Sequence, residues 1–98
     1  MRVGWTELAL DRVDEIARYI ARDDREAALL WAAALFEAVH QLSTFPESGR
    51  VVPELEAHAV RELVHGAYRV FYRVDAIVTI MSVRHAGQLL RPDELTRD

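Results

Sequence analysis

The stretch from Ala59 to His85, AVRELVHGAYRVFYRVDAIVTIMSVRH, decides the fold of this chain. It contains three runs rich in Val, Ile, Tyr and Phe, interrupted at residues 65–67 and again at residues 75–76. Aromatic and β-branched residues favour strands, and short breaks that contain Gly or Asp are typical of tight turns. The stretch therefore predicts three consecutive antiparallel strands, connected as a meander.

The middle run has two different faces, because successive side chains of a strand point to opposite sides of the sheet. One face carries Tyr68, Val70, Tyr72 and Val74, and the other carries Arg69, Phe71 and Arg73. We expect the first face to pack into the core. The second face, which bears the arginines, is a candidate binding surface.

Two helices are predicted between a first short strand at residues 2–6 and the meander. Thr6 can cap a helix that ends near Arg22, and apolar residues recur along it at steps of three and four. Asp23, followed three residues later by Glu26, predicts the cap of a second helix that ends near Thr44. A connection of about two residues makes the pair an antiparallel hairpin.

The predicted fold class is therefore α+β: an N-terminal strand, a two-helix hairpin and a three-stranded antiparallel meander. Residues 50–57, which include Pro53, are expected to form a connecting loop. A short C-terminal tail follows the meander, and residues 92–95 are expected to form one helical turn. With 98 residues, we expect one domain spanning residues 1–98.

Composition excludes several classes of site. The chain has no cysteine, so disulfides, thiolate metal ligands and cysteine catalysis are excluded. All 12 basic residues are arginine against 16 acidic residues, for a net charge of −4, whereas proteins that hold nucleic acid through phosphates usually carry a basic excess. No long apolar segment is present. We expect a soluble, cytoplasmic protein without a membrane partner.

Few motifs in the chain point to catalysis. The four histidines lack metal-ligand spacing, and the four glycines form no phosphate loop, so we expect neither a metal nor a cofactor. His85 follows Arg84 at the end of the last predicted strand, where imidazole could move a proton beside a guanidinium. The alternative, in which Arg84 forms an ion pair and His85 only ends the strand, is favoured.

The helices carry more apolar residues than their core-facing stripes require. Leu10 and Tyr19 on the first helix, and Leu29 and Phe36 on the second, fall outside those stripes. Either a partner protein covers some of these side chains, or they pack around the core outside its main stripes.

An ordered set of segments resembles the RelE/ParE superfamily, the toxins of bacterial type II toxin-antitoxin pairs. The set comprises Trp5 and Ala9, Ile16 with Tyr19-Ile20, Phe45-Pro46 followed by Gly49-Arg50, Arg61-Glu62-Leu63, the run Tyr68–Val74, and Val83 with His85. The resemblance covers nearly the whole chain. It implies a strand, a helical hairpin and a meander, in agreement with the order derived from the residues.

The superfamily contains two competing activities. Similarity to the RelE-like branch implies mRNA cleavage on the ribosome, and the catalytic residues of this alternative are Arg69, Arg84 and His85. The absence of lysine, the negative net charge and the lack of any tyrosine after Tyr72 count against it. The Arg-Glu-Leu strand and the extended hairpin resemble the ParE-like branch better, which implies inhibition of DNA gyrase by binding.

We therefore expect a ParE-like binding inhibitor, rather than an enzyme, that a cognate antitoxin neutralises. The predicted target- or partner-binding residues are Arg61, Arg69, Arg73, Arg84 and His85. The residues predicted to lie in an antitoxin-binding groove are Leu10, Tyr19 and Phe36.

Overall fold

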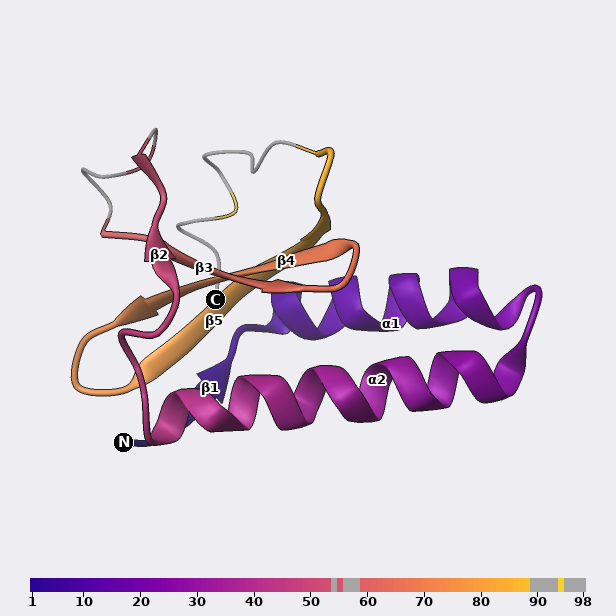
Figure 1. The fold of residues 1–98 in the computed structure, drawn as a ribbon, viewed down its shortest axis with the longest axis horizontal. Coiled ribbons are helices and arrows are strands. Elements are labelled where there is room, and N and C mark those ends of the chain that lie inside the picture. The colour runs from indigo at the N-terminus through magenta and orange to yellow at the C-terminus, as the bar shows by residue number, and fades with distance from the viewer. Residues whose placement is uncertain (54, 56–58, 89–93, 95–98) are drawn as a thin grey trace.

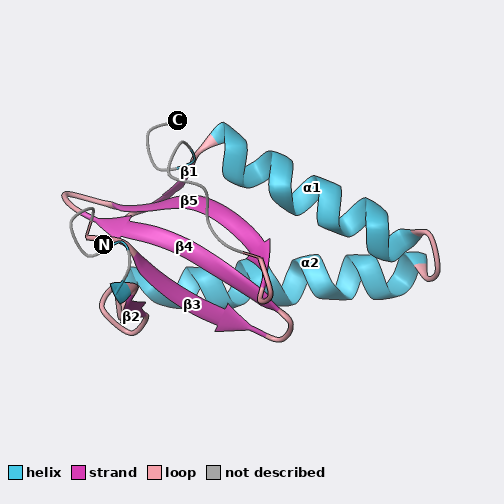
Figure 2. Ribbon diagram, turned by 90° about the horizontal axis from the view of Figure 1, so that it is seen from above, coloured by secondary structure: helices cyan, strands magenta, loops and turns pink. Residues whose placement is uncertain are grey.

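The computed structural model, which describes residues 1–53, 55, 59–88 and 94, has two layers. An antiparallel pair of helices packs against a five-stranded sheet, and the tip of the pair extends beyond the sheet (Figure 1). Seen from above, the strands cross in front of the second helix (Figure 2). The elements are β1 (Val3–Trp5), α1 (Glu7–Ala21), α2 (Arg25–His40), the 3₁₀ turn η1 (Gln41–Ser43), β2 (Arg50–Val51), β3 (Arg61–His65), β4 (Tyr68–Val74) and β5 (Val78–His85).

The strand order in the sheet is β1-β5-β4-β3-β2. Strands β3, β4 and β5 form the predicted antiparallel meander, and β1 pairs in parallel with β5, Val3 opposite Val78 and Trp5 opposite Ile80. The predicted α+β class and order of elements are confirmed. The parallel partnership of the first strand with the last is a tertiary feature that the sequence pattern did not indicate.

The predicted loop over residues 50–57 is wrong for its first two residues. Arg50 and Val51 form β2, paired antiparallel with Glu62 and Arg61 of β3. The amide of Val52, which is fully buried, then donates to the Val60 carbonyl at 2.9 Å. Two valines before Pro53 favour a short strand, and proline, which has no N–H to donate, is tolerated only at its end. Residues 54 and 56–58, including His58, lie outside the described part of the chain.

The main core lies between the helices and the sheet face that carries Tyr68, Val70, Tyr72 and Val74, as predicted. A β-bulge in the pairing of β4 with β5 adds Met81 to β5. The extra residue shifts the alternation, so the helix-facing residues of β5 change from even to odd numbers. Those helix-facing residues are Val78, Ile80, Val83 and His85.

The opposite face of the sheet, here called the outer face, is less open than we expected. Phe71 is fully buried there, in a second apolar cluster with Val52 and Val60, and Leu55 packs against this cluster. Val52, Leu55 and Val60 therefore cover part of the outer face. The arginines beside it are only partly exposed.

The helix caps correct one detail of the prediction. Thr6 accepts a hydrogen bond from the Ala9 amide at 3.0 Å, as predicted. Asp24, and not Asp23, caps α2 by accepting from the Ala27 amide at 3.0 Å. Asp23 instead lies in the turn that follows α1, where its amide donates to the Ile20 carbonyl.

The buried stripe of α2 is narrow. Leu35 and Val39 are buried, but Leu30 of the same helix is 64% exposed. At about 100° per residue, Leu30 lies about 140° around the helix from Leu35.

None of the described helices is long and apolar enough to cross a membrane. Of the predicted turn over residues 92–95, only Glu94 is among the described residues.

Candidate functional site

The outer face holds a buried carboxylate between two arginines. Glu62, only 4% exposed, accepts hydrogen bonds from Arg50 Nε at 2.5 Å and from Arg69 Nε at 2.6 Å. The Arg69 guanidinium also lies over the Phe71 ring, 4.7 Å from its centroid. Burial alone would raise the pKa of Glu62, but the hydrogen bonds and charges of the two arginines outweigh it and lower the pKa below its ordinary value. Glu62 is therefore an ionised partner of Arg69.

A second buried carboxylate, Glu94, lies beside β5. It accepts hydrogen bonds from Ser82 Oγ at 3.0 Å, from Arg84 at 2.8 and 3.0 Å, and from Arg12 Nε at 3.3 Å. Arg12 belongs to α1, so Glu94 connects the first helix to the last strand. The favoured alternative for Arg84, an ion pair, is what the structure shows.

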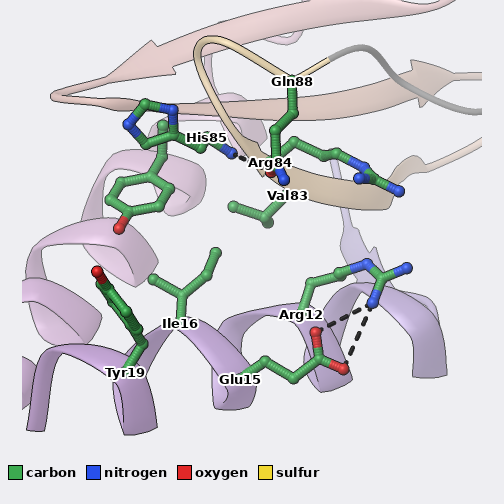
Figure 3. A pocket seen from close by; sticks show the side chains of 9 residues that line it. Arg12, Glu15, Ile16, Tyr19, Val83, Arg84, His85 and Gln88 are labelled. Atoms are coloured by element: carbon green, nitrogen blue, oxygen red, sulfur yellow. Dashed lines mark hydrogen bonds and ion pairs between the residues drawn. The ribbon is translucent and has the colours of Figure 1, made fainter. Parts of the chain in front are cut away.

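His85 lies on the opposite face of the sheet from Arg69 and Arg84. In the β4–β5 register Arg69 pairs with Arg84, and Tyr68 pairs with His85. The His85 ring packs edge-on against Tyr68, at 5.6 Å between centroids, and Tyr68 packs against Trp31 of α2. Figure 3 shows His85 and Arg84 pointing away from each other. The three residues of the ribonuclease alternative are therefore divided between two faces.

A hollow of about 580 Å³ opens between α1 and the end of β5 (Figure 3). Charged residues, aromatic rings and aliphatic groups all contribute to its wall. It is lined by Arg12, Glu15, Ile16, Tyr19, Tyr68, Val83, Arg84, His85 and Gln88. Of the predicted residues, Tyr19, Arg84 and His85 line this hollow, and the side chains of Arg84 and His85 do so from opposite faces of the sheet.

The other two predicted arginines lie elsewhere. Arg61 donates to the carbonyls of Glu47 and Gly49 at 3.2 and 2.8 Å, and so holds the loop before β2. Arg73 lies on the outer face opposite Thr79, half-buried, and has no ion pair among the residues that the structure describes. Arg61 thus has a clear local role, whereas Arg73 keeps its charge available.

The three residues of the predicted antitoxin groove are all substantially exposed, Leu10 by 46%, Tyr19 by 67% and Phe36 by 41%. Tyr19 lines the hollow, whereas the Phe36 ring packs against Trp5 at 4.9 Å between centroids. Leu29 and Leu30 of α2 are also exposed, by 73% and 64%. The exposed apolar surface therefore extends over the hairpin and is not confined to one groove.

Sequence reasoning missed the two carboxylates that organise the arginines. The sequence could have revealed the Glu62–Arg69 pair. The two-residue turn Gly66-Ala67 sets His65 opposite Tyr68, and this register places Glu62 and Arg69 on one face of the sheet. Gly66 has the positive φ of 59° that such a turn needs. Glu94 gave no comparable signal, because its place depends on the path of the chain after β5.

Comparisons with known proteins agree with this fold. The family model described as the ParE toxin of type II toxin-antitoxin systems matches residues 3–90. The Y4kP protein of Sinorhizobium fredii is 40% identical over 89 residues, which are 89% of this chain and 90% of that protein. Toxin RelE2 of Caulobacter vibrioides is 36% identical over 90 residues, 90% of this chain and 98% of that toxin.

Two solved structures share the fold. A chain of the chromosomal ParDE system from P. aeruginosa superposes with a TM-score of 0.71 at 24% identity, covering 87% of this chain and 95% of that one. A chain of the RelBE2 toxin-antitoxin complex from Mycobacterium tuberculosis gives a TM-score of 0.63 at 25% identity, covering 89% and 92%. The match of the family model over residues 3–90, with the 40% identity to Y4kP, shows that the chain belongs to the ParE toxin family of type II toxin-antitoxin systems.

Proposed function

We propose that this toxin stops growth by binding DNA gyrase, without a catalytic step, and that a cognate antitoxin neutralises it. The observation that supports binding is the pairing of Arg69 and Arg84 with buried carboxylates, while His85 lies on the other face of the sheet. Gyrase as the target comes from the resemblance to the ParE-like branch and from the family match.

Cleavage of a phosphodiester requires a group that takes a proton and a group that stabilises the developing charge, both close to the same phosphate. A guanidinium stays protonated at neutral pH and cannot be the base. The carboxylates of Glu62 and Glu94 are buried and already accept hydrogen bonds from arginines. This geometry favours a surface that presents fixed charge to a partner over a site that transfers protons.

The test is a gyrase supercoiling assay with purified toxin, run beside a translation reaction in which mRNA is checked for cuts. We expect supercoiling to fall and cleaved DNA complexes to accumulate, with mRNA intact. Cutting of mRNA on ribosomes by substoichiometric toxin, with supercoiling unaffected, would contradict the proposal.

A RelE-like ribonuclease is the second candidate, and the similarity to a toxin named RelE2 over nearly its whole length favours it. Its catalytic residues would be Arg69, Arg84 and His85. In that case His85→Gln should abolish toxicity, and the purified toxin should cut mRNA on translating ribosomes while leaving gyrase supercoiling unaffected.

The antitoxin is proposed to cover exposed apolar surface of the helical hairpin and the hollow, including Leu10, Tyr19 and Phe36. Two observations support such a partner. The matched structures are titled as toxin-antitoxin systems or complexes, and exposed apolar area of this extent favours association. Because gyrase and ribosomes are both cytoplasmic, we propose that the toxin acts in the cytoplasm.

A further inference from the structure

We propose that Ser82, Arg84 and Arg12 form a carboxylate-binding site, which this chain fills with its own Glu94 and which binds a carboxylate from outside when Glu94 leaves it. Ser82 and Arg84 belong to β5, and Arg12 belongs to α1. Glu94 lies ten residues after Arg84, beyond the end of the strand. The site itself does not depend on which molecule the toxin acts on.

Both oxygen atoms of the Glu94 carboxylate are recognised. Oε1 accepts hydrogen bonds from Ser82 Oγ at 3.0 Å and from Arg12 Nε at 3.3 Å. Oε2 accepts from Arg84 Nε at 3.0 Å and from Arg84 Nη2 at 2.8 Å. Each oxygen therefore has at least two donors, and this arrangement fits the planar, two-oxygen head of a carboxylate.

The donors of this site are buried and need an acceptor. Ser82 is fully buried, and the side chains of Arg84 and Glu94 are 14% and 2% exposed. A buried hydroxyl or a largely buried guanidinium is costly to leave without an acceptor. The surroundings of Ser82 and Arg84 therefore favour an anion at this position, whichever molecule supplies it.

Glu62 shows how an arginine-bound carboxylate differs when it is part of the sheet. Glu62 also accepts from two arginines, but it belongs to β3, which is paired on one side with β2 and on the other with β4. Its carboxylate cannot leave without disturbing those strands. Glu94 lies outside the five strands, so its side chain can be exchanged for another carboxylate while the sheet stays paired.

The site shares two side chains with the hollow between α1 and β5. Arg12 and Arg84 line that hollow, and Arg12 also forms an ion pair with Glu15 of its wall (Figure 3). With Glu94 in place, two arginines face two carboxylates, and the charges of the group balance. Without Glu94, one positive charge remains in largely buried surroundings. That surplus charge favours the binding of an external anion.

Glu94 competes for the site from within the chain, which gives it an advantage over a dissolved carboxylate. Formate is the smallest molecule with the same head group. A ligand of three heavy atoms binds with a dissociation constant of about 1 mM at the tightest. Formate should therefore bind when the Glu94 side chain is removed and should not displace it from the wild-type protein.

The test is thermal unfolding of Glu94→Ala in sodium formate, with sodium chloride at the same ionic strength as the reference. The alanine leaves space that formate can fill. At about ten times its dissociation constant, formate should raise the Tm of this variant by at least about 5 °C relative to chloride. The shift should saturate, and wild type should show no shift specific to formate.

Glu94→Gln is the matched control, because its amide fills the same space without a charge. Formate should leave the Tm of this variant unchanged. Formamide, the neutral analogue of formate, should not stabilise Glu94→Ala. When Ser82→Ala is combined with Glu94→Ala, more formate should be needed for the same shift, because one donor of the site is lost.

An acidic side chain of a bound protein has the same chemistry as formate. The cognate antitoxin distinguishes the two sources, and this arm alone rests on the antitoxin proposed above. If the antitoxin supplies the carboxylate, its affinity for Glu94→Ala exceeds its affinity for wild type, and formate cancels the gain. Equal affinities, with the formate shift present, assign the site to small carboxylates.

The Tm measurements decide whether the site exists. A saturable formate shift that is confined to Glu94→Ala and weakened by Ser82→Ala supports it. Equal shifts in wild type and Glu94→Ala, or no shift in a folded Glu94→Ala, overturn the inference. If Glu94→Ala is unfolded in chloride, recovery of its helical circular dichroism in formate supports the site. No recovery at any formate concentration that leaves wild type folded overturns it.

Discussion

Glu62 is the residue on which the outer face of the sheet depends. Its side chain is 3% exposed, and Arg69, its closest partner, is 13% exposed, so water cannot replace either partner fully. A salt bridge in such surroundings contributes little net stability when intact, but its disruption leaves an uncompensated buried charge. A catalytic role would require Arg69 to be free, but its guanidinium is held by Glu62.

We expect Glu62→Gln to lower the free energy of unfolding by about 3 kcal/mol, because Arg69 would keep its charge without a carboxylate. Urea denaturation of the purified toxin measures this. Asp14→Asn is the matched control, since its ion pair with Arg18 is exposed on both sides and should contribute less than about 1 kcal/mol. Equal losses in the two variants would show that burial does not set the strength of the Glu62 pair.

Glu62 also predicts how stability depends on pH. Its folded-state pKa is lowered from 4.5, so on acidification the unfolded chain takes up the proton first. The stabilisation is therefore complete above the unfolded pKa and is lost as pH falls through the lowered folded pKa. The difference in unfolding free energy between wild type and Glu62→Gln should be constant near neutral pH and shrink in this acidic range. A difference that grows on acidification would reverse the assigned sign.

At the scale of elements, substitutions at the start of α2 test which aspartate caps the helix. Asp24→Ala removes the hydrogen bond to the Ala27 amide and should cost about 1 kcal/mol. Asp23→Ala should cost less, because no side-chain hydrogen bond of Asp23 to the helix is present in the described structure. Thermal unfolding of the two variants side by side measures the difference. A larger loss for Asp23→Ala would restore the cap that the sequence pattern favoured.

The elements were largely predictable from the sequence, because periodicity and turn residues act locally. The meander and the hairpin depended on such patterns, and the alternation in β4 placed Tyr72 and Phe71 on the correct faces. What the sequence did not reveal depends on contacts between distant segments. The bulge at Met81, the pairing of β2 with β3 and the position of Glu94 beside Arg84 all arise from packing. The sequence therefore identified candidate site residues one by one, but not how they are arranged in space.

For the whole molecule, the exposed apolar residues of the helical hairpin predict where an antitoxin binds. Tyr19→Ala and Phe36→Ala should each weaken binding of the cognate antitoxin by about 1–2 kcal/mol, as expected for exposed aromatic anchors. Calorimetric titration measures the effect, and Val64→Ala, at a 63% exposed side chain on the outer face of β3, serves as the control that should leave antitoxin affinity unchanged. Unchanged affinity in both hairpin variants would move the antitoxin to another surface.

The parallel pairing of β1 with β5 also has a consequence for synthesis. Val3 and Val78 are partners although the chain between them includes both helices and two other strands of the meander. On a ribosome that adds roughly 5–20 residues per second, β1 waits several seconds for its neighbour. Until β5 has emerged, the nascent chain lacks Val78, Ile80 and Val83 from the main core. The toxin therefore completes its fold only late in translation, and earlier fragments do not yet present the outer face or the hollow in their native form.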